Sequence, residues 1–189
     1  LGSIWADKTR FEMNQEQRQK LSFKKEILYS SGRISATLPP DKEEELKTKV
    51  VAVIFEGMKN PNPGIVSASI RAISALKLEQ AIPEIERIAE TWDVNYYYDA
   101  LEALSYIGGD KGAGALVRLS YKAAAEKNYY RRCERLSSVL HHMKYVKSYI
   151  LISRLTELLR DKSGIESDWS STQNLVCDES AAALVIICP

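Results

Sequence analysis

The chain has 189 residues, of which 45% are apolar and 27% charged, and its formal net charge is +1. This composition excludes the collagen-like and disordered classes, and the longest apolar run, Ala181 to Cys188, is far shorter than the roughly 20 residues of a membrane-spanning helix. The near-neutral total also argues against a chain that is basic throughout, as dedicated nucleic-acid binders are.

Helical periodicity runs through most of the chain, and Pro and Gly residues separate the helices. The apolar spacing predicts a leading helix over residues 15–29 and a second helix that starts at Pro39 and Pro40 and ends before the break at residues 60–64. Seven further helical segments are expected at residues 71–76, 80–89, 99–104, 113–122, 135–140, 148–160 and 179–184. No segment alternates apolar and polar residues for long enough to predict a strand.

Four of these segments share one pattern, an Ala-rich or small-residue helix that closes on a leucine. The closing leucines, Leu76, Leu104, Leu140 and Leu184, are 28, 36 and 44 residues apart, with a mean of 36. The segments between them carry one apolar stripe each. One helix pair cannot bury its own apolar face, so the pairs are expected to stack into an all-α, right-handed α-solenoid of about four to five helical hairpins.

The expected domain organisation follows from this repeat. Residues 1–64 are expected to supply N-terminal helices and a capping hairpin, and residues 65–189 the repeats, as one continuous domain. The apolar run before Pro189 is expected to pack against further chain, which would make this sequence a fragment.

Several stretches carry a more specific motif. Residues 178–184 read Asp-Glu-Ser-Ala-Ala-Ala-Leu, residues 107–110 read Ile-Gly-Gly-Asp, and residues 80–85 read Gln-Ala-Ile-Pro-Glu-Ile. In this the chain resembles HEAT repeats, specifically the bacterial HEAT-like repeats first noted in phycobilisome lyases. The resemblance covers residues 66–160 and departs from the family pattern at the insertion over residues 161–176. It implies an armadillo-like fold, whereas the family's functions include scaffolds, lyases, hydroxylases and carriers.

No arrangement of catalytic or metal-binding residues emerges from the sequence. His141 and His142 are adjacent and would point about 100° apart on a helix, and no acid lies three or four residues from either one. The cysteines, Cys133, Cys177 and Cys188, include no CxxC pair, which argues against a disulfide framework or a zinc site. We therefore expect no enzymatic activity, no cofactor and no metal.

The near-neutral total conceals a basic middle. Residues 110–160 hold 11 Lys/Arg against 4 Asp/Glu, a balance of +7, whereas residues 61–109 (3 against 7) and 161–189 (1 against 5) each balance at −4. Nine of the ten tyrosines lie between Tyr96 and Tyr149. Tyr and Arg are enriched at binding hot spots, although tyrosines can also cap the core between helices. The candidate binding residues of this stretch are Tyr121, Lys122, Tyr129, Tyr130, Arg131 and Arg132.

Three further candidates, Arg87, Arg118 and Arg154, each precede an apolar residue of a second helix. Stacked repeats would place them as a ladder on the concave side. Such a ladder either engages carboxylates or phosphates of a partner, or forms salt bridges within the stack. The acids available for those salt bridges include Glu84, Glu86 and Glu157.

The leading functional hypothesis is a non-enzymatic scaffold or adaptor that binds another protein on its concave face and basic, Tyr-rich middle. The alternative is a polyanion or nucleic-acid binder through residues 110–160, whose affinity would fall steeply with salt. A lyase-like accessory enzyme rests on the resemblance alone. Residues 1–6 are either the remnant of a signal peptide, which implies an exported bacterial protein of the periplasm or surface, or a tag remnant on a cytoplasmic one.

Overall fold

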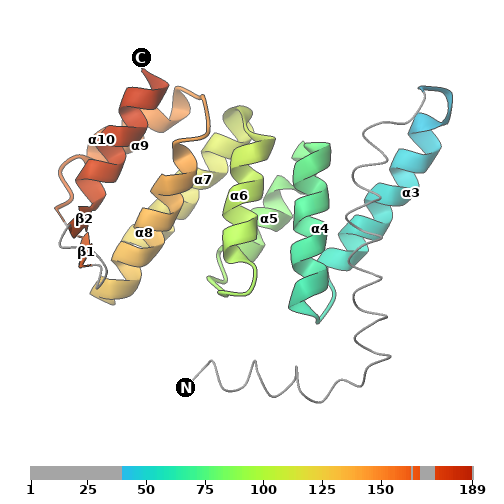
Figure 1. Cartoon of the computed structure of the whole chain (residues 1–189), viewed down its shortest axis with the longest axis horizontal. Helices are drawn as coiled ribbons and strands as arrows, with labels where there is room; N and C mark the ends of the chain where they lie inside the picture. The colour runs from blue at the N-terminus through green and yellow to red at the C-terminus, as the bar shows by residue number, and fades with distance from the viewer. Residues whose placement is uncertain (1–39, 163, 167–172, 189) are drawn as a thin grey trace. The chain divides into compact units, whose positions relative to one another are not determined.

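The structure is a computed structural model that describes residues 40–162, 164–166 and 173–188 (Figure 1). The leading helix expected over residues 15–29, the segment at residues 1–6 and Pro189 lie outside the described residues. Contacts divide the chain after Ala72, inside a helix, into two compact units that are described separately here. The repeat boundary expected after residue 64 stays a prediction.

The first unit holds α3 (Pro40–Met58) and most of α4 (Pro63–Leu76). The Asn-Pro-Asn-Pro sequence ends one helix and starts the other, because the Asn62 side chain accepts a hydrogen bond from the Gly64 backbone N–H at 2.9 Å and Pro63 occupies the first helical position. The two helices approach closely at Gly57. A Cβ atom at that position would lie 2.2 Å from Ser69 Oγ.

The second unit is helical through most of its described length. It begins with a short 3-10 turn (Glu79–Ala81) that leads directly into α5. Its helices are α5 (Ile82–Ala89), α6 (Tyr97–Ile107), α7 (Gly109–Ala124), α8 (Tyr129–Met143), α9 (Ile150–Leu158) and α10 (Val176–Ile187). Each predicted helical segment that falls in this unit is therefore confirmed as a helix, and the all-α character of the chain is confirmed.

The helices of the second unit form two rows. Helices α5, α7 and α9 pack in series, as do α6, α8 and α10, and α5 and α6, α6 and α7, α7 and α8, and α9 and α10 also pack together. Figure 1 shows α6 and α8 in front of α5 and α7. Between the rows lies a core of fully buried aliphatic side chains, which includes Ile85, Leu101, Leu104, Leu116, Leu119, Leu136, Leu140, Leu151 and Leu155.

Two glycine-dependent features bring α6 and α7 together. Gly108 and Gly109 have φ angles of 68° and 59°, in the left-handed region that favours glycine, and they reverse the chain within the predicted Gly-Gly-Asp turn. Gly112 lies where α7 passes the end of α6, and a Cβ atom there would be 2.5 Å from the carbonyl oxygen of Leu104. The turn and the close approach together set the separation of the two helices.

The insertion between α9 and α10 departs from the sequence-based expectation that the chain has no strands. It contains β1 (Gly164–Glu166) and β2 (Gln173–Leu175), which pair antiparallel with Ile165 opposite Asn174. Three-residue strands are too short for an alternating pattern to be recognised, which is why the sequence did not predict them. Among the helices of the described residues, none is long and apolar enough to cross a membrane.

Candidate interaction surface

The three candidate arginines have different surroundings, and the structure does not place them as one uniform ladder. Arg87 on α5 pairs with Glu84 of its own helix at 2.6 Å, and its side chain is 62% exposed. Arg118 on α7 binds Glu86 of α5 through two hydrogen bonds of 2.8 and 2.7 Å. The hydrogen bond to Glu86 raises the pKa of Arg118. Both arginines are thus already engaged with carboxylates of the chain itself.

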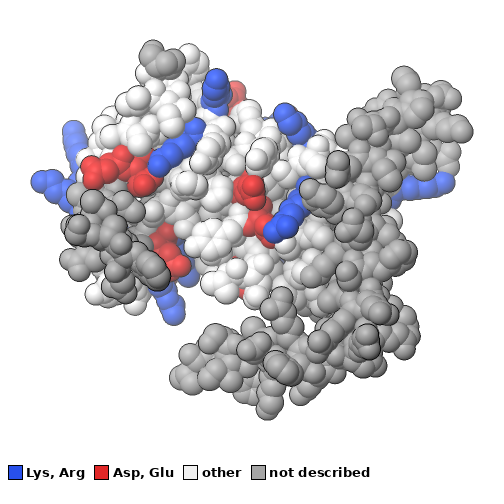
Figure 2. Space-filling view, viewed as in Figure 1, with Lys and Arg blue, Asp and Glu red and all other residues white. Residues whose placement is uncertain are grey.

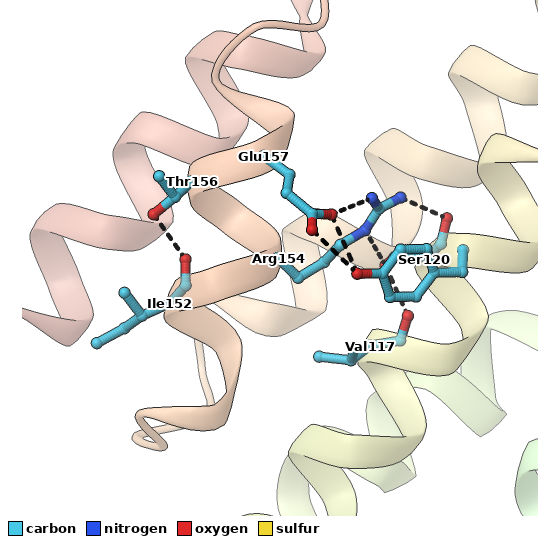
Figure 3. A network of polar contacts seen from close by, with 7 residues as sticks. Val117, Ser120, Ile152, Arg154, Thr156 and Glu157 are labelled. Atoms are coloured by element: carbon cyan, nitrogen blue, oxygen red, sulfur yellow. Dashed lines mark hydrogen bonds and ion pairs between the residues drawn. The ribbon is translucent and has the colours of Figure 1, made fainter.

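Arg154 on α9 is the buried member of the set, with a side chain only 8% exposed. Its Nε donates to Ser120 Oγ at 2.8 Å and one terminal nitrogen donates to the Ser120 carbonyl oxygen at 3.2 Å, so the guanidinium reaches across to α7 (Figure 3). The other terminal nitrogen pairs with Glu157 at 2.8 Å. The guanidinium also lies 3.9 Å from the ring centroid of Tyr121, whose hydroxyl donates to Glu157 at 3.0 Å.

This network affects the ionisation of its carboxylate. The hydrogen bonds from Arg154 and then from Tyr121 hold the pKa of Glu157 below its ordinary value. Tyr121, one of the candidate binding residues, therefore uses both its ring and its hydroxyl inside the chain. Its contacts join α7 to α9.

A second set of contacts joins α5 and the residues at its two ends to α7 in a regular register, and we call them the α5–α7 ion pairs. Lys111 pairs with Glu79 at 2.7 Å, Arg118 pairs with Glu86, and Lys122 pairs with Glu90. In each pair the basic residue follows its acidic partner by 32 positions. The sequence did not reveal this register, because it becomes visible only when the two helices are placed side by side.

These and similar contacts neutralise much of the positive charge of residues 110–160. Seven cations of this stretch form ion pairs, namely Lys111, Arg118, Lys122, Arg132, Arg135, Lys144 and Arg154. Five of the partner acids, Glu79, Glu86, Glu90, Asp161 and Glu179, lie in the acidic stretches on either side. Figure 2 accordingly shows blue and red side chains interspersed on its visible face and no continuous basic field.

The start of α8 has a different character. Tyr129 and Tyr130 are exposed there, Tyr130 to 74%, and their rings meet edge to face with centroids 5.7 Å apart. The side-chain oxygen of Asn128 caps the helix by accepting from the Arg131 backbone N–H at 3.1 Å. Arg132 lies next to the end of α9, because it pairs with Asp161 at 3.5 Å.

Four exposed cations next to these residues in sequence form no ion pair among the described residues: Lys127 and Arg131 at the start of α8, and Arg160 and Lys162 on either side of Asp161. We call these four residues together with Tyr129 and Tyr130 the α8 patch. The sequence singled out Tyr129, Tyr130 and Arg131 but missed the other three cations. Those lie at helix ends, where the sequence does not show whether an acid from another helix meets them.

The other tyrosines divide between core and surface. Tyr97 is buried, its hydroxyl lies 3.3 Å from Ser138 Oγ, and burial raises its pKa. This is the core-capping role that the sequence left open. In contrast, Tyr98, Tyr106, Tyr145 and Tyr149 are exposed.

The histidines differ in the same way. His142 is largely buried, its Nδ1 lies 2.8 Å from the Ser138 carbonyl oxygen, and burial lowers its pKa. His141 is exposed and packs edge to face on Tyr145. Within residues 40–162, 164–166 and 173–188, no group of three or more His, Cys, Asp or Glu residues is arranged to hold a metal ion.

Comparison of the chain with protein-family models, with characterised proteins and with solved structures finds no match. The resemblance to HEAT repeats therefore rests on the residue pattern of the chain itself. On the surface of the second unit, the cations of the α8 patch form no ion pairs among the described residues, whereas the charges of α5, α7 and α9 discussed above are paired.

Proposed function

We propose that the chain is a HEAT-like α-solenoid that acts as a non-enzymatic adaptor and binds another protein. Two observations support the repeat architecture. Helices of the second unit pack on their neighbours and next neighbours in the chain, as stacked hairpins do. The constant separation of 32 residues in the α5–α7 ion pairs is typical of consecutive copies of one unit.

The observation that carries the binding function is the contrast between cations that form ion pairs and cations that form none among the described residues. Arg87, Arg118 and Arg154 are held by carboxylates of the chain, so using them for a partner would first break those contacts. The α8 patch instead exposes two tyrosines beside cations with no acid partner among the described residues. Aromatic side chains on a rigid helix bind with little loss of conformational entropy.

Nucleic-acid binding through the whole of residues 110–160 has less support. Seven of the eleven cations that this proposal needs already pair with carboxylates of the chain itself. No described contact favours a lyase-like activity.

Photo-crosslinking in the cells that make the protein tests the adaptor function. A benzophenone amino acid in place of Tyr130 should yield one defined protein adduct. The same probe in place of Tyr106, which is 63% exposed on α6, serves as the matched control and should not. Adducts of equal yield at both positions, or none at Tyr130, would contradict a partner site at the α8 patch.

A further inference from the structure

The partner of the α8 patch can be described by its chemistry. We propose that the patch binds an acidic, extended segment of the partner protein, through carboxylates that pair with Lys127, Arg131, Arg160 and Lys162. This inference rests on the proposed function and specifies the kind of partner.

The local charge balance favours an anionic ligand. Two acids near the patch have cationic partners: Glu126 pairs with Arg135, and Asp161 pairs with Arg132. Glu134, which lies three residues after Arg131 on α8, is exposed and forms no ion pair among the described residues. The pKa of Glu126 is held below its ordinary value, chiefly by a hydrogen bond from the Asn128 backbone N–H, so this acid is ionised but engaged. The four cations of the patch are exposed, and although Arg131 also interacts electrostatically with Glu126, they outnumber Glu134 and leave a local positive excess.

One of these cations, Arg131, lies in the first turn of α8. The first turns of α5, α6 and α7 each contain an acid, Glu84, Asp99 and Asp110 respectively. The first turn of α8, like those of α4 and α9, contains no acid, and it carries Arg131 next to Arg132, which pairs with Asp161. Peptide dipoles place partial positive charge at a helix start, so arginines there add to a field that already attracts carboxylates.

The tyrosine geometry and the number of cations favour a peptide over a nucleic acid. The rings of Tyr129 and Tyr130 stand at 83° to each other and do not form parallel platforms on which successive bases could stack. Four unpaired cations also match a short run of carboxylates better than a long phosphate backbone, which needs more contacts for firm binding. An arginine such as Arg131 can hold a carboxylate in a bidentate manner.

Fluorescence anisotropy with the full chain tests the inference. The probes are a fluorescein-labelled oligoglutamate peptide and a single-stranded oligonucleotide of equal charge. The double variant Lys127→Ala/Arg131→Ala should weaken peptide binding about five-fold, as expected for two exposed charge contacts. The control Lys111→Ala/Lys122→Ala removes the same charge from paired cations on α7 and should change the affinity less than about two-fold. A second patch variant, Arg160→Ala/Lys162→Ala, should weaken peptide binding in the same way. It changes a different segment of the chain, so a local folding defect in the first variant cannot explain a loss seen in both.

Three results would overturn the inference. Equal loss in the patch and control variants would show that the peptide responds to net charge alone. Tighter binding of the oligonucleotide, lost in the same patch variants, would identify the site as a nucleic-acid site. If the peptide does not bind while the adduct at Tyr130 still forms, the acidic partner is wrong and the adaptor function stands. If both fail, the adaptor function fails as well.

Discussion

Arg87 and Arg154 look alike in the sequence, since each precedes an apolar residue of its helix, yet burial gives them different roles. The Arg154 side chain is almost completely enclosed and makes three hydrogen bonds in addition to its contact with the Tyr121 ring. The Arg87 side chain lies mostly in solvent and pairs within its own helix. The sequence predicted ion pairing as one of two roles for these arginines, but it could not predict which of them is buried.

We expect Arg154→Ala to lower the free energy of unfolding by about 2–3 kcal/mol, because it removes charged hydrogen bonds from a buried site that joins α7 to α9. Arg87→Ala, the matched control, should cost less than about 0.5 kcal/mol, since exposed ion pairs contribute little. Urea unfolding followed by circular dichroism measures both. Similar costs for the two variants would show that the network of Figure 3 does not stabilise the fold.

His142 should make stability depend on pH in the weakly acidic range. Burial, with a smaller contribution from His141, lowers its folded pKa below the ordinary 6.5, while the hydrogen bond with the Ser138 backbone and, more weakly, Glu102 act in the opposite direction. The unfolded chain therefore takes up the proton first as pH falls, and stability should decrease from about pH 6.5 downward. His142→Gln should flatten the melting temperature between about pH 7 and pH 5, and His141→Gln should not. Parallel curves for the wild type and His142→Gln would contradict this assignment.

At the level of elements, α7 contains two glycines close together, Gly112 and Gly114, and the contact with α6 depends on Gly112 alone. Gly112→Ala should destabilise the chain by about 1–3 kcal/mol, because the new methyl group would meet the backbone carbonyl of Leu104. Gly114→Ala lies one half-turn further along α7, where the nearest atom is the end of the flexible Arg118 side chain at 3.4 Å. It should stabilise by up to about 1 kcal/mol through helix propensity. Thermal unfolding of the two variants should therefore shift in opposite directions.

The α5–α7 ion pairs should not contribute equally to stability. Glu86 is only 11% exposed and binds Arg118 in a bidentate manner, whereas both partners of the Lys111–Glu79 pair are well exposed. A double-mutant cycle with alanine should give a coupling energy of about 1 kcal/mol for Arg118 and Glu86, and below about 0.5 kcal/mol for Lys111 and Glu79. A reversed order would show that burial does not determine the strength of these pairs.

Most helices of the chain could be predicted from its sequence, because Ala-rich apolar periodicity and Gly or Pro breaks are local signals. Candidate residues at the start of α8 were also visible, since Tyr129, Tyr130 and Arg131 are adjacent. What could not be predicted depends on the register between helices. Glu86 reaches Arg118 only because α5 lies beside α7, and Arg160 joins the α8 patch only because Asp161 meets Arg132.

At the level of the whole molecule, the alternating −4, +7 and −4 balances are largely an internal arrangement, in which the acidic stretches neutralise the basic one. Any single-stranded polyanion that binds should therefore displace few counterions. We expect the logarithm of its affinity to fall with the logarithm of salt concentration at a slope of about −3, if it binds through the four cations of the α8 patch. Titrations over a range of NaCl concentrations measure this slope, and a value near −8 would mean that all the cations of residues 110–160 are engaged.

The constant offset of 32 residues between α5 and α7 also determines how such a chain can be recombined. A hairpin transplanted into another protein would leave its basic residues without the acids that the preceding hairpin supplied. A graft that carries residues 79–124 together would keep every pair intact. For protein engineering, the smallest exchangeable module of this chain is therefore the interface between two consecutive hairpins, with the residues of both hairpins that form it, and not the single hairpin.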